Sequence, residues 1–184
     1  MFVANFAYEP NVDAAHWFCA EILPRILECV PEAHAVLVGN EPPPGVLELR
    51  CEHVEVTGFV PSVRPYLDRA AVAVAPQRIG GGIKVKVLEA LCRGKAVVST
   101  SVGVQGLRPL AHESVVVADG PARFAAEYVR LLGDAEARRE PERRAVALAG
   151  KLPTWDEAAA ALLDCDRELA AEPALAGAEG AELR

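Results

Sequence analysis

The sequence lacks the long apolar segments that mark membrane and secreted proteins. No run approaches the roughly 18 consecutive apolar residues that a membrane-spanning helix needs. The first residues, MFVANFAYEPN, have neither the basic start nor the long apolar core of a signal peptide. Aromatic residues are also scarce, at 5% of the chain, so alanine, valine and leucine must supply most of the core. We therefore expect a soluble, cytoplasmic protein with no transmembrane segment.

Cysteine and histidine are too scattered to indicate a disulfide framework or a metal site. No C-x-x-C pair occurs among the cysteines, which are Cys19, Cys29, Cys51, Cys92 and Cys165. An odd, dispersed set is typical of reduced thiols in a cytosolic protein. The histidines show no metal-ligand spacing and pair with no plausible nucleophile; they are His16, His34, His53 and His112. No acid–base pair is visible, so the catalytic residues stay unknown at this level.

Basic residues are outnumbered by acidic ones, 19 to 26, which gives a net charge of −7. A nucleic-acid backbone demands a basic face, so this balance argues against a nucleic-acid partner. It is compatible with a local basic pocket for a diphosphate. With 184 residues, 52% of them apolar, the chain has room for one ordinary domain with its own core.

Short apolar runs alternate with helical patterns over the first two thirds of the chain. The runs predict buried strands at Met1–Phe6, Ala33–Val38, Val54–Thr57, Ala71–Ala75, Ala96–Thr100 and Val115–Ala118. The helices are expected from Asn11 or Asp13 to about Val30 with a kink at Pro24, from Ser62 through Leu67, over Gly82–Arg93 and over Phe124–Leu132. A single helical turn is possible over 46–51. Such alternation predicts an α/β fold, a Rossmann-like doubly wound parallel sheet of about six strands.

The pattern changes after residue 134. We expect a Rossmann-like domain over 1–134, C-terminal closing helices over 135–171, and a disordered tail over 172–184 that is rich in Ala, Glu and Gly. Within the closing helices, Thr154 followed three residues later by Glu157 predicts a capping box.

The glycine loop Gly80-Gly81-Gly82 is the first candidate for ligand chemistry. It lies between a buried strand and a helix, where glycines let the backbone approach a ligand and the first N–H groups of the helix face an anion. Neither the phosphate-binding G-x-x-x-x-G-K-[ST] pattern nor the dinucleotide-binding G-x-G-x-x-G pattern is present. A bare turn is the alternative interpretation.

Charged residues around this loop complete the candidate site. Arg78, Lys84 and Lys86 are the cations within reach, and one of them could neutralise a diphosphate. The two lysines lie about 200° apart on a helix, so both cannot face the loop. Glu89 interrupts an apolar run and could accept hydrogen bonds from ribose hydroxyls. The alternative for Lys86 and Glu89 is a structural salt bridge three residues apart.

These segments resemble the C-terminal, donor-binding half of GT-B glycosyltransferases of the family 4 / group 1 type. The resemblance rests on FVANFAYEPNVDAAHWF, VTGFVPSVRPYLDRAAVAVAP, RIGGGIKVKVLEALCRGKAVVSTSVGVQGL and LPTWDEAAAALLDCDREL. It implies two Rossmann-like domains facing each other across a cleft, with a nucleotide sugar of the UDP, GDP or ADP type bound mainly to the second. It further implies hexosyl transfer with retention, in glycan biosynthesis, and no metal or other cofactor.

The resemblance also assigns roles to single residues. Glu89 matches the second glutamate of the family's E-x7-E signature, which contacts the ribose. Ile83 to Val85 match the helix N-terminus that holds the diphosphate, and Phe59 and Val60 match the turn that contacts the base. The first glutamate of the signature falls at Gly81, a feature shared by a glycine-rich branch of the family. Ile83 stands where that branch commonly has threonine.

Three functional alternatives stay open at this point. The first is the donor-binding half of an enzyme that needs an N-terminal acceptor domain, carried on a partner chain or otherwise supplied, and that is inactive alone. The second is a non-catalytic interaction module that keeps the half-fold, and the third is a sugar-nucleotide epimerase. A full enzyme packs its closing helix on the other domain, so the helix from Trp155 could here serve self-association.

Overall fold

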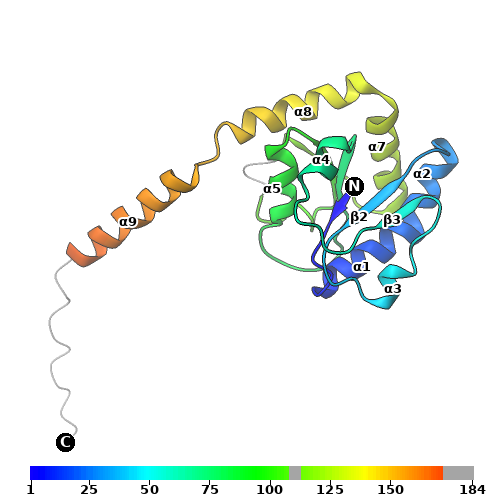
Figure 1. Ribbon diagram of the computed structural model, residues 1–184. Helices are drawn as coiled ribbons and strands as arrows, with labels where there is room; N and C mark the ends of the chain where they lie inside the picture. Colours follow the sequence, from blue (N-terminus) through cyan, green and yellow to red (C-terminus); the bar gives the residue numbers. More distant parts are fainter. Residues whose placement is uncertain (108–112, 172–184) are drawn as a thin grey trace, which may run out of the picture. The chain divides into compact units, whose positions relative to one another are not determined.

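The computed structural model describes residues 1–107 and 113–171 (Figure 1). Residues Met1–Gly150 form one compact unit and Lys151–Arg184 form another. The first unit holds the parallel strands and every residue predicted to bind a ligand. Its last helix, α8 (Ala135–Ala149), buries Ala145 and Leu148 in the core of this unit.

The described residues form two three-stranded parallel sheets. Their strands are β1 (Phe2–Val3), β2 (Ala35–Val38), β3 (Val54–Val56), β4 (Val72–Ala75), β5 (Ala96–Ser99) and β6 (Val115–Val117). Two backbone hydrogen bonds join β1 to β4, from Met1 N to Val72 O and from Val74 N to Met1 O, each 2.9 Å long. The spatial order is therefore 3-2-1-4-5-6, that of a Rossmann-like fold. The doubly wound α/β prediction is confirmed, and each strand is shorter than its apolar run.

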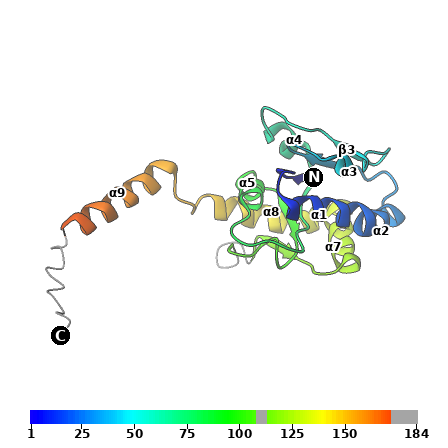
Figure 2. The same ribbon diagram turned by 90° about the horizontal axis from the view of Figure 1, so that it is seen from below.

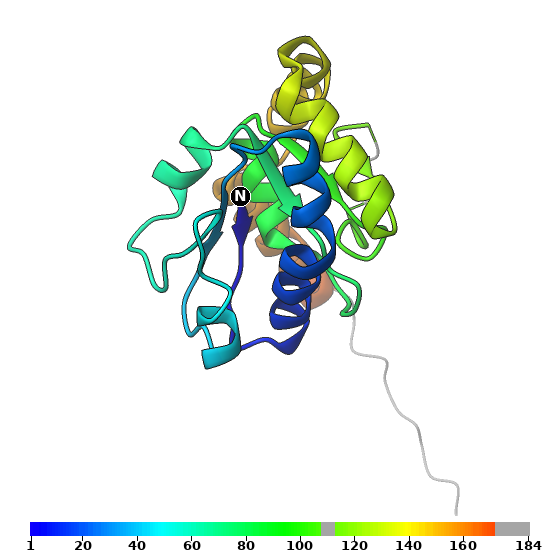
Figure 3. The same ribbon diagram turned by 90° about the vertical axis from the view of Figure 1, so that its right-hand side faces the viewer.

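Helices cover both faces of the sheets (Figure 3). On one face lie α1 (Glu9–Trp17), the π-helical turn η1 (Phe18–Ile22), α2 (Leu23–Cys29) and α7 (Pro121–Gly133). On the other lie α4 (Arg64–Arg69), α5 (Val85–Cys92) and α8. The rings of Phe18 and Phe124 meet edge-on in the first core, and Leu67 and Leu91 are buried in the second. Figure 2 shows α5 beside α8, where Gly94 leaves room for Val146.

The first long helix differs from its prediction. It begins at Glu9, two residues before Asn11, with Pro10 in its first turn. The kink expected at Pro24 is a π-helical turn just before it, and Pro24 lies in the first turn of α2. Proline has no N–H to donate and its ring crowds the carbonyl four residues earlier, so a wider turn relieves the clash. The helical turn expected over 46–51 also lies earlier, as α3 (Pro44–Leu47).

The second unit contains α9 (Trp155–Ala171), which begins with the predicted capping box. Thr154 N donates to Glu157 Oε2 at 2.7 Å, and Glu157 N donates to Thr154 Oγ1 at 3.2 Å. The predicted tail over 172–184 and the side chain of Trp155 lie outside the described residues. Within residues 1–107 and 113–171, no helix is long and apolar enough to cross a membrane.

Candidate functional site

The carboxyl ends of the strands bring the predicted site residues to one edge of the sheets. The chain leaves β3 toward Phe59 and Val60, and leaves β4 toward Arg78 and the glycine loop. Between β1 and β4 the strand order reverses, which creates the crevice where open α/β sheets bind ligands. The loops after β1 and β4 flank that crevice.

The glycine loop is held by its own lysine. Gly80 and Gly82 have φ of +102° and +72°, a backbone region that favours glycine. The Lys84 side chain is buried and folds back on the loop, with Nζ donating to Gly81 O at 2.9 Å and to Gly82 O at 3.1 Å. Of the two lysines, only Lys84 bonds to the loop carbonyls in the described structure. The loop is thus a tight turn whose carbonyl groups are held by the Lys84 ammonium.

The helix after this loop begins at Val85, so the predicted start at Gly82 is wrong. Gly82 is left-handed and Lys84 is extended, with ψ of 94°, because the loop must turn back for Lys84 to reach its carbonyls. No side chain caps α5 among the described residues, and Ile83 and Val85 are exposed. The first N–H groups of α5 are therefore open to an anion from outside.

Val60 and Glu89 line one cavity of about 480 Å³, together with Pro61, Ser62, Val63, Arg64, Leu67 and Arg93. It lies between the segment that follows β3 and the outer side of α5. Although Glu89 interrupts an apolar run, which placed it near a buried boundary, its side chain is exposed, because Val87, Ala90 and Leu91 take the core-facing side of α5. The Glu89 side chain has no hydrogen bond or ion pair in the described part of the chain. Its carboxylate is thus free to accept hydrogen bonds from a ligand in this cavity.

Two arginines that line this cavity were not predicted from the sequence as site residues. Arg64 and Arg93 both pair with Asp68, at 3.8 Å for Arg64 Nε and 3.1 Å for Arg93 Nε. The hydrogen bond from Arg93 lowers the pKa of Asp68, so this carboxylate stays ionised. Arg93 follows Glu89 by one helical turn, and that spacing was the signal that could have placed it here.

The three candidate cations all have protein partners. Arg78 donates to Asp13 from Nε at 3.1 Å and lies over the ring of Trp17. Lys86 Nζ donates to Asn11 Oδ1 at 2.6 Å, across the crevice from α5 to α1. The alternative salt bridge between Lys86 and Glu89 is wrong: in the described residues Lys86 Nζ bonds to Asn11 instead, and Glu89 lines the cavity beside Val60.

The family model described as "Glycosyl transferases group 1" matches residues 1–134, most of the chain. This chain belongs to the glycosyl transferases group 1 family. A curated relative from Klebsiella pneumoniae, an uncharacterized 44.6 kDa protein in the cps region, is 23% identical over 139 residues. That match covers 70% of this chain and 36% of the relative, so the chain spans little more than a third of the relative's length.

Solved structures agree on the fold of this group 1 chain. The C-terminal domain of the group 1 family protein LpcC from Francisella tularensis gives a TM-score of 0.65 at 16% identity, covering 82% of this chain and 83% of that one. HepE of Anabaena, solved with UDP and glucose, gives 0.72 at 14% identity, covering 92% of this chain and 47% of HepE. The fold is that of the C-terminal half of a GT-B glycosyltransferase, as the resemblance implied.

A buried polar network at the crevice was not foreseen from the sequence. Asn11 Nδ2 donates to Asn5 O at 2.7 Å, and Gln77 Nε2 donates to Asn11 Oδ1 at 3.2 Å. Gln77 is 1% exposed, and its Oε1 has no hydrogen-bond partner in the described residues. Single amides on separate segments carry no motif, so sequence alone could not have assembled this group.

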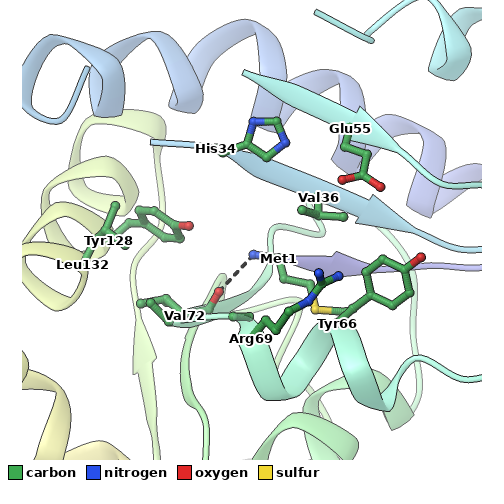
Figure 4. A pocket seen from close by; sticks show the side chains of 11 residues that line it. Met1, His34, Val36, Glu55, Tyr66, Arg69, Val72, Tyr128 and Leu132 are labelled. Carbon is green, nitrogen blue, oxygen red and sulfur yellow. Dashed lines mark hydrogen bonds between the residues drawn. The ribbon is translucent and has the colours of Figure 1, made fainter. Parts of the chain in front are cut away.

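A second cavity of the group 1 chain, of about 360 Å³, lies at the opposite edge of the sheets (Figure 4). It surrounds Met1, whose nitrogen donates to Val72 O, and Tyr128 projects toward it from α7. Burial raises the pKa of Tyr128 to about 12, so this hydroxyl stays neutral. None of the predicted site residues lines this cavity.

Proposed function

We propose that this chain is the donor-binding half of a retaining glycosyltransferase. The complete enzyme would transfer a hexosyl group from a nucleoside diphosphate to a hydroxyl acceptor in glycan synthesis. The observation that carries the proposal is the cavity shared by Val60 and Glu89, beside the uncapped start of α5. Membership of the group 1 family supports it, as does the UDP in the similar HepE structures.

In this proposal each part of the edge has one task. The nucleoside would enter the cavity, with the main chain of Phe59–Val60 at the base and the Glu89 carboxylate accepting from the ribose. The diphosphate would lie at the first N–H groups of α5, where the helix dipole favours negative charge. Those N–H groups would stabilise the leaving group as the sugar departs. No metal enters this scheme, which remains a prediction from the resemblance.

We further propose that transfer needs an acceptor-binding half of similar size. The chain spans 36% of its curated relative and 47% of HepE, so whole relatives have room for such a domain. The unit described here offers one wall of a cleft. On its own it would bind nucleotide without transferring sugar, and sugar transfer by this chain alone would contradict this part of the proposal.

Calorimetric titration with UDP, GDP and ADP tests the donor site. We expect one nucleotide to bind at micromolar to low-millimolar strength, and Glu89→Gln to weaken it about tenfold, since a neutral amide replaces the charged acceptor of the ribose hydrogen bonds. Glu52→Gln is the matched control, because Glu52 is also exposed but lies before β3, outside the cavity. Equal losses in both variants would remove the role of Glu89. If no nucleotide binds, the proposal fails and the interaction module becomes the better account.

A further inference from the structure

Lys86 lies in an environment with no negative partner. It is the second residue of α5, and its Nζ lies 4.6 Å from the centre of the Phe2 ring as well as 2.6 Å from Asn11 Oδ1. Both contacts are neutral groups. No carboxylate lies within ion-pair distance of Lys86 in residues 1–107 and 113–171.

The charged groups on the neighbouring elements do not change this picture. Before α5, Lys84 carries the same sign as Lys86 and repels it. On α1, Asp13 is already bound by Arg78. The nearest side chains from β1 and from the segment after β4 are Phe2 and Gln77, and neither can ionise. The start of α5 thus combines a helix N-terminus with two lysines and no compensating anion.

The hydrogen bonds of the crevice fix the position of the Lys86 side chain but give its amine no negatively charged partner. Asn5 O orients the amide of Asn11, so Asn11 presents Oδ1 to both Gln77 and Lys86. A neutral amine can also donate to that oxygen, more weakly than an ammonium. An added proton therefore gains no new acceptor from the described protein groups. Burial, with repulsion from Lys84, accordingly lowers the pKa of Lys86 to about 7.

We propose that Lys86 takes up a proton when the diphosphate of a nucleotide sugar occupies the start of α5, so that donor binding is proton-linked. The inference rests on the proposed function. The diphosphate is the first anion to arrive near this amine, and an opposite charge stabilises the protonated form. The proton comes from the solvent, and Lys86 then holds the donor as an ammonium. Donor affinity should consequently fall as the pH rises above 7.

The test is calorimetric titration with UDP-glucose, GDP-mannose and ADP-glucose at pH 7, each in PIPES and in imidazole buffer, neither of which brings inorganic phosphate to the site. Nucleotide sugars serve better than free diphosphates because their phosphates do not titrate near pH 7. The dependence of the observed enthalpy on the buffer's ionisation enthalpy gives the protons taken up. We expect uptake of roughly half a proton for the sugar nucleotide that binds. Affinity should also fall by up to about tenfold per pH unit above pH 7.

Variants assign the proton to Lys86. Lys86→Met should abolish the uptake, and Lys86→Arg should bind without uptake because its guanidinium is always charged. Lys151→Met, which removes an exposed lysine outside the first unit, should keep the uptake of the unaltered protein. As a measurement free of folding defects, NMR titration of the Lys86 side chain should show its pKa rising when the sugar nucleotide saturates the site.

The outcomes separate the two proposals. Binding without proton uptake, or an unchanged Lys86 pKa in the complex, overturns the inference and leaves the donor site standing. Failure of all three nucleotide sugars and of the free nucleotides to bind overturns the proposed function and the inference with it.

Discussion

At the scale of single residues, the burial of Lys86 lowers its pKa and so links the stability of the protein to pH. The pKa of its ammonium is about 7 in the folded chain, against 10.5 in the unfolded chain. Between these values the unfolded chain binds more protons, so stability should rise with pH, by at most about 1.4 kcal/mol per unit for this group. Urea unfolding of the unaltered protein and Lys86→Met at pH 7, 8 and 9 measures this. We expect the stability of the unaltered protein relative to the variant to increase with pH; parallel pH profiles would contradict the assignment.

Residue-scale chemistry was only partly accessible from the sequence. The sequence places Glu89 and Val60 at the same sheet edge, and the structure puts both on one cavity. The exposure of Glu89 could not be predicted, because it depends on which side of α5 faces the core. The bond from Lys86 to Asn11 joins residues 75 positions apart, and no local pattern records such a contact.

At the scale of elements, the glycine loop and the start of α5 form one structural unit. The sequence identifies the loop by its three glycines but starts the helix too early. A helical pattern cannot show that Lys84 turns back to the carbonyls of Gly81 and Gly82. The consequence is functional, since the free N–H groups of the helix begin at Val85, after the loop that Lys84 closes.

Two alanine substitutions test whether the site needs the backbone conformation of the glycine loop. Gly82 has φ of +72°, where a side chain is strained, so Gly82→Ala should cost about 1–2 kcal/mol of stability and weaken nucleotide binding. Gly81 has no such φ and open space around its Cα, so Gly81→Ala should change both little. Thermal unfolding and nucleotide titration of both variants measure the difference. Equal effects would show that the backbone shape of the loop is not what the site needs.

At the scale of the whole chain, the strand order sets the place of the site. All six strands were predictable, because runs apolar on both faces are distinctive and helical patterns separate them. Their spatial order follows from the join between β1 and β4, which rests on the pairing of Met1 with Val72 and Val74. That pairing puts the reversal of strand order beside the loop of Gly80–Gly82, the place where an α/β sheet accepts a ligand.

The central claim is that nucleotide binds at the carboxyl edge of the first unit. Mapping backbone amide shifts by ¹H–¹⁵N NMR during titration with UDP, GDP and ADP tests it most directly. We predict that the binding nucleotide shifts amides over 58–63 and 80–89, which border the Val60–Glu89 cavity and the start of α5. Shifts gathered around His34, Val72 and Tyr128, the cavity at the opposite edge, would contradict the account, as would no shift with any nucleotide.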